Sequence, residues 1–91
     1  MTRAKRCEMI MPMSQLPIIS ADFHNADKQG RVRLNTVGSI EDLGRLGIQL
    51  VDGLRVTIHD EELEADGEVL YSSDEGIWVA KIDWVAVRHV A

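Results

Sequence analysis

The sequence predicts a mainly β fold, a small barrel of four to five short strands with one short helix. Three observations lead to this prediction. Several short segments alternate polar and apolar residues with a period of two, as half-buried strands do. Two intervals between them, residues 60–62 and 72–76, are short and polar like hairpin loops. Only residues 39–46 place apolar side chains at a helical spacing.

The composition is that of one folded domain. The chain has 91 residues, of which 45% are hydrophobic, so it can bury one compact core but not a second. We therefore divide it into a leader over residues 1–20 and a single domain over residues 21–91. The leader contains both prolines and has no regular apolar period, although residues 16–20 fit an edge strand.

The leader also allows other readings. Its basic start followed by apolar residues resembles a signal peptide, but Glu8 and Pro12 interrupt the apolar run. Met11 and Met13 offer an alternative translation start, in which the basic prefix is a mis-annotated start and not part of the protein.

The first half of the domain is expected to contain a turn, a strand and the helix. Residues 27–30 end in a glycine suited to a tight turn. Residues 31–35 then alternate, with Val32 and Leu34 facing inward and the arginines between them facing outward. Ser39 fits the N-cap of a short helix that Gly47 ends.

The second half is expected to contain the remaining strands. A turn at Asp52 and Gly53 starts a strand over residues 54–59, and a return strand follows over residues 63–71. Gly67 within it predicts a bulge or a sharp bend, as a barrel corner requires. Residues 77–83 form another strand that directs Trp78, Ala80 and Ile82 to one face, and a last strand, or a turn into one, closes the chain.

This order resembles the SH3-like small barrels of the KOW or Tudor type. The resemblance covers residues 48–90 and depends on residues 53–58, 67–69 and 78–80, which combine glycines with alternating apolar residues. It implies a domain that binds nucleic acid, ribosomal or polymerase surfaces, or modified or extended peptides. The chain departs from the nucleic-acid branch because it is acidic where those domains are basic.

A second, partial resemblance is to the AbrB-like swapped-hairpin regulators and antitoxins. It depends on residues 27–34, 46–48 and 53–56, although the interval between the first two pieces is longer than that pattern allows. The resemblance implies a dimer that contacts DNA through arginines of this region.

Charge favours a protein partner over nucleic acid. The formal net charge is −5, and such a balance repels nucleic acid and anionic membranes and favours a basic partner. No apolar run is long enough to span a membrane. The single cysteine, Cys7, cannot form an internal disulfide, which favours the reducing cytoplasm.

The sequence supports no enzymatic site, cofactor or metal. The three histidines lie far apart, and neither a nucleophile elbow nor a phosphate-binding loop is present. Residues 59–62, His-Asp-Glu-Glu, are the densest set of metal-ligand types. A small metal-dependent enzyme using His59 is therefore the remote alternative, and a solvated acidic loop is the simpler interpretation.

The function expected is a non-enzymatic protein-interaction or regulatory module of the cytoplasm. Trp78, Trp84 and Tyr71 are the candidate partner-binding residues, because tryptophan is enriched at binding hot spots. If the strand does not bend, Trp84 continues the face of Trp78, Ala80 and Ile82, so the two tryptophans fit a core anchor better than an exposed platform. A homodimer seam would use the same residues.

The alternative is a dimeric DNA-binding transcriptional regulator or antitoxin. Its candidate nucleic-acid-binding residues are Arg31, Arg33 and Arg45. The simpler interpretation of these arginines is that they pair with the surplus of carboxylates.

Overall fold

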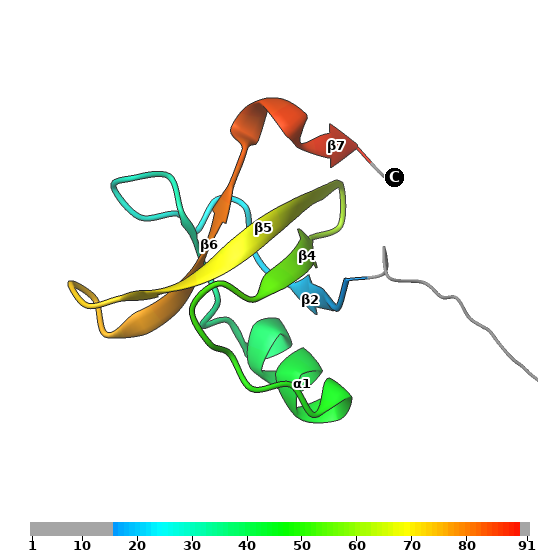
Figure 1. Cartoon of the computed structure of the whole chain (residues 1–91). Coiled ribbons are helices and arrows are strands. Elements are labelled where there is room, and N and C mark those ends of the chain that lie inside the picture. Colours follow the sequence, from blue (N-terminus) through cyan, green and yellow to red (C-terminus); the bar gives the residue numbers. More distant parts are fainter. Residues whose placement is uncertain (1–15, 90–91) are drawn as a thin grey trace, which may run out of the picture.

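The computed structural model describes residues 16–89 and is mainly β, with one α-helix (Figure 1). The strands and the helix follow in this order: β2 (Ile18–Ser20), β3 (Val32–Arg33), α1 (Val37–Leu46), β4 (Arg55–His59), β5 (Leu63–Ser72), β6 (Ile77–Ile82) and β7 (Arg88–His89). A short 3-10 helix, η2 (Trp84–Ala86), lies between β6 and β7. The mainly β prediction with a single helix is confirmed.

The six strands form one curled sheet in the order β2-β4-β5-β6-β3, with β7 pairing the start of β5. Only the β2–β4 pair is parallel, and the other pairs are antiparallel. Figure 1 shows β5 as the long central strand and α1 on the side of β2. The sheet therefore bends around one core as an open half-barrel.

The strands predicted from alternation are confirmed. Residues 54–59, 63–71 and 77–83 correspond to β4, β5 and β6, within one residue at each end. The 72–76 loop turns at Gly76, whose φ of 69° favours glycine. In the 60–62 loop, the Asp60 carboxylate accepts hydrogen bonds from the backbone N–H groups of Glu62 and Leu63. These two tight loops fix the register of three consecutive strands.

The edge segment expected at residues 16–20 is present as β2, and it belongs to the folded domain. Ile19 is fully buried in the core, and the backbone N–H of Thr57 donates to the carbonyl of Pro17. The domain thus begins before Ala21, where the sequence reading started it. Residues 1–15, with the rest of the predicted leader and the alternative start, lie outside the described residues.

The helix begins three residues earlier than predicted. Thr36 is the N-cap, because its hydroxyl accepts the backbone N–H of Ser39 at 3.0 Å. Ser39, predicted as the cap, is fully buried inside the helix and donates its hydroxyl to the carbonyl of Ser20. The predicted end is confirmed, since Gly47 adopts the left-handed conformation with a φ of 67°.

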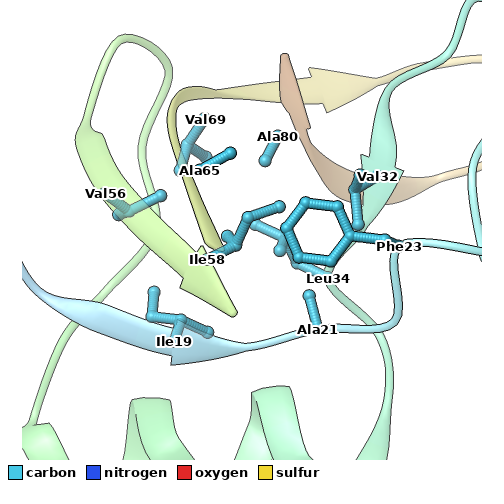
Figure 2. Close-up of a cluster of buried hydrophobic side chains, with 10 residues drawn as sticks. All are labelled: Ile19, Ala21, Phe23, Val32, Leu34, Val56, Ile58, Ala65, Val69 and Ala80. Atoms are coloured by element: carbon cyan, nitrogen blue, oxygen red, sulfur yellow. The ribbon is translucent and has the colours of Figure 1, made fainter. Parts of the chain in front are cut away.

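The core lies inside the curl of the sheet. Figure 2 shows ten buried side chains that converge from the strands and from the segments beside them. The predicted inward residues Val32 and Leu34 are among them. Partly buried residues, including Trp78 of β6 and Leu50 after the helix, pack against this cluster.

Gly67 is needed for close packing. It does not mark a bulge, which was one of the two features predicted at this position. Pairing runs through it without interruption, opposite Val56 on one side and Ile82 on the other. A Cβ at Gly67 would lie 2.8 Å from the Ile82 side chain and 2.9 Å from the Lys81 carbonyl oxygen. Only a residue without a side chain therefore lets β6 approach β5 in this register.

We expect Gly67→Ala to lower the free energy of unfolding by about 1–3 kcal/mol, because the new methyl group meets backbone and a packed side chain. Gly44→Ala is the matched control, since a Cβ at this exposed helical position meets nothing within 4 Å. It should stabilise the protein by about 0.5–1 kcal/mol. Urea unfolding of both variants measures the difference, and equal stabilities would contradict the packing role of Gly67.

Candidate functional site

The aromatic residues proposed as a binding site separate into two pairs. Tyr71 and Trp78 are cross-strand neighbours in β5 and β6, with ring centroids 5.1 Å apart and planes at 73°. Trp84 instead lies edge-to-face with Phe23, at 6.1 Å and 82°. The structure thus brings Tyr71 and Trp78 together and places Trp84 in another contact.

Trp84 makes contacts within the fold while 45% of its surface stays exposed. β6 ends at Ile82, and Asp83 caps η2 by accepting the backbone N–H of Val85, so the chain turns before Trp84 and removes it from the face of Trp78. Its indole Nε1–H donates to the carbonyl of Gly30 at 2.7 Å, and its ring meets the buried Phe23. Trp84 thereby closes one side of the core and holds the 27–30 turn.

Tyr71 and Trp78 form an exposed corner at the end of the β5–β6 hairpin. Trp78 is partly buried against the core, whereas Tyr71 keeps 47% of its surface exposed. The Tyr71 hydroxyl lies 3.8 Å from the position that a Cβ on Gly76 would take, so the ring leans over the hairpin loop. The Trp78 ring is held in place by the core, and the Tyr71 ring beside it is accessible to a ligand.

A carboxylate lies beside this corner. Asp52 Oδ1 accepts the backbone N–H of Tyr71 at 2.8 Å. The turn that contains Asp52 runs along β5, because Gly53 donates to the Val69 carbonyl and Val69 donates to the Leu54 carbonyl. We name the set of Asp52, Tyr71 and Trp78 the aromatic corner. Sequence reasoning used Asp52 only as a turn residue and missed this proximity.

The arginines of the DNA-binding alternative are each held by a carboxylate. Arg31 Nε donates to Asp27 at 2.8 Å, and Arg45 donates to Asp42 at 3.1 Å. Arg33 makes a two-pronged contact with Glu75, at 2.7 and 2.8 Å, which lowers the pKa of that carboxyl. Their positive charges are therefore largely balanced at the surface.

Two polar pockets flank the strands. One, of about 320 Å³, lies between the 27–30 turn and the 72–76 loop, and its lining mixes Arg31 and Lys28 with acidic side chains. The other, of about 410 Å³, is lined by His24 and by residues 60–62. Across residues 16–89, no group of three or more His, Cys, Asp or Glu side chains is arranged to hold a metal ion.

Serine, histidine and aspartate side chains meet where α1 packs on β2, in a set that the sequence did not reveal. The Ser20 hydroxyl donates to Asp42 Oδ2 at 2.7 Å and lies 3.4 Å from His59 Nε2. In a catalytic triad the histidine takes the serine proton and the carboxylate orients the histidine. Here the carboxylate accepts the hydroxyl directly, so the arrangement fits a structural clamp and not a nucleophile.

This clamp, formed by Ser20, Ser39, Asp42 and His59, joins α1 to the edge strand β2. Asp42 Oδ2 also accepts the backbone N–H of Ser20 at 2.8 Å, and Ser39 donates to the Ser20 carbonyl. Hydrogen bonds from the Ser20 side chain and backbone, followed by the one from Arg45, lower the pKa of Asp42 to about 2. The backbone groups of Ser20 are thus bonded to side chains of α1, which blunts the β2 edge.

No family model matches the chain, and searches of curated proteins and of solved structures gave no match. Within the described part of the chain, no helix has the length and apolar character needed to cross a membrane.

We expect Asp42→Asn to destabilise the protein at neutral pH by about 1–3 kcal/mol, because it replaces hydrogen bonds to a charged acceptor by weaker ones. The pKa of Asp42 is about 2 when folded and near 3.8 as a free side chain. Its charge therefore stabilises the fold fully above pH 3.8, and this contribution disappears as the pH falls toward 2.

Unfolding curves between pH 7 and pH 2 measure this contribution. The difference in stability between the natural protein and Asp42→Asn should narrow as the solution is acidified below pH 3.8. Glu41→Gln on the exposed side of α1 is the control, and it should leave the curve nearly unchanged. A constant difference across the range would show that Asp42 is not charged in the clamp.

Proposed function

We propose that the protein is a non-enzymatic interaction module that binds a protein partner inside the cell through the aromatic corner. The open half-barrel supports this proposal because it is compatible with the fold of SH3-like small barrels. The site is Tyr71 and Trp78 on the β5–β6 hairpin, with Asp52 beside them.

The observation that carries this proposal is the exposure of Tyr71 on a fixed aromatic neighbour. A half-exposed tyrosine held edge-to-face against a partly buried tryptophan offers rigid contact area with little ordering cost. Trp84 is 45% exposed, but we leave it out of the proposed surface because it packs on Phe23 and bonds Gly30, apart from Tyr71 and Trp78.

Charge supports a protein partner over nucleic acid. Residues 16–89 contain seven basic and fourteen acidic side chains, and four of the seven basic ones pair with carboxylates: Arg31, Arg33, Arg45 and Arg88. A surface with this balance attracts basic groups and repels phosphates. The DNA-binding alternative therefore ranks second.

We expect an affinity pull-down from native lysate, with the tagged full chain as bait, to retain a specific protein after nuclease treatment. Tyr71→Thr should reduce its recovery about tenfold, because a central aromatic contact is lost while the strand is preserved. Mass spectrometry identifies and quantifies the retained protein.

Val85→Ser is the matched control for removal of an exposed apolar side chain. Val85 is 94% exposed and lies in η2, away from the aromatic corner, so recovery of the partner should not change. Loss of all retained material on nuclease treatment would instead favour the DNA-binding alternative. Equal recovery with Tyr71→Thr would overturn the proposed site.

A further inference from the structure

The aromatic corner combines two features that bind a cation. The rings of Tyr71 and Trp78 stand at 73° with centroids 5.1 Å apart, so they form two walls of a shallow corner. A cation placed on the face of an aromatic ring is attracted by its quadrupole. The exposed ring of Tyr71 leaves room for such a cation without moving the core.

Asp52 adds a negative charge at the same place. Its Oδ1 accepts the Tyr71 backbone N–H, and no cation in the described range 16–89 forms an ion pair with it. This distinguishes Asp52 from the acidic residues that bind arginines, such as Asp27 and Glu75. The side chain is exposed and is thus available to an external partner.

Charged side chains of both signs surround Asp52 and the aromatic corner. Glu68 Oε2 lies 3.9 Å from the position that a Cβ on Gly53 would take, next to Asp52. Asp74 is exposed in the hairpin loop over which Tyr71 leans. Two cations lie nearby, since Arg55 and Lys81 both face Glu68 across the sheet. Their positive charges offset the negative charge of Glu68, whereas Asp52 forms no ion pair with another residue of the described range.

We propose that the aromatic corner binds an arginine side chain from a basic segment of the protein partner. This inference rests on the proposed function and adds the chemistry of the ligand. A guanidinium is planar, stacks on an aromatic face and donates from its edge to a carboxylate at the same time. An ammonium is a strongly hydrated point charge that gains less from the ring. The ring of Tyr71 and the carboxylate of Asp52 together suit the planar group.

The test is NMR titration of the labelled full chain with three blocked peptides that are identical except for arginine, lysine or citrulline at two positions. We expect the arginine peptide to bind at least about fivefold more tightly than the lysine peptide. The citrulline peptide, which keeps the planar shape without the charge, should not bind measurably. Shifts should concentrate at residues 51–53, 71 and 78.

Two variants separate the contributions of charge and ring. Asp52→Asn keeps an oxygen for the Tyr71 N–H and should weaken arginine binding about tenfold, whereas the exposed Glu61→Gln, with the same change in net charge, should not. Tyr71→Leu should weaken it by a similar factor. Equal affinity for lysine and arginine, or full affinity in Asp52→Asn, overturns the inference.

Failure of the arginine inference can be distinguished from failure of the proposed function. If Tyr71→Thr loses the cellular partner while no arginine peptide binds, the corner is a binding site for another ligand and only the inference fails. If Tyr71→Thr keeps the partner, the proposed function fails at this site. Binding of arginine peptides to a chain that retains no protein partner would likewise contradict the proposed function and leave the arginine site in place.

Discussion

The antiparallel pairing of β5 with β6 is the constraint on which the rest of the structure depends. β5 is the central strand, bordered by β4 on one side and by β6 and β7 on the other. Gly67 permits the close approach of Ile82, and the same register places Tyr71 opposite Trp78. A slip by one residue would send one member of that pair to the other face of the sheet. Core packing and the aromatic corner are therefore set by one alignment.

A second constraint holds the sheet at its open side. β2 is only three residues long and pairs with β4 in parallel, and parallel pairing contributes slightly less per residue than antiparallel pairing. Ser39 and Asp42 of α1 bond the carbonyl and N–H of Ser20. The helix thus protects an edge that would otherwise be open to pairing with other chains, while the binding surface that we propose lies on the β5–β6 hairpin.

Local patterns in the sequence were enough to predict the hairpins, and long-range contacts were not. Because the 60–62 and 72–76 loops are short, their lengths determine which residues pair across each hairpin. Extending the β4–β5 pairing past Arg55 places Asp52 opposite Tyr71, so this contact could have been predicted from the sequence. The clamp could not be predicted from the sequence. It joins Ser20 to Asp42, which is 22 positions away, and to His59, which is 39 positions away, and it depends on a short parallel strand with a weak sequence pattern. Trp84 was misplaced because Asp83 ends the alternation by capping η2.

The register of β5 against β6 is tested most directly by nuclear Overhauser contacts in the isotopically labelled full chain. Our account predicts backbone contacts between Tyr71 and Trp78, contacts between their ring protons, and proximity of the Tyr71 amide to the Asp52 side chain. Contacts of Tyr71 with Ile77 or Val79 across the strands, in place of Trp78, would show a shifted register. That result would contradict both the packing of Gly67 and the existence of the aromatic corner.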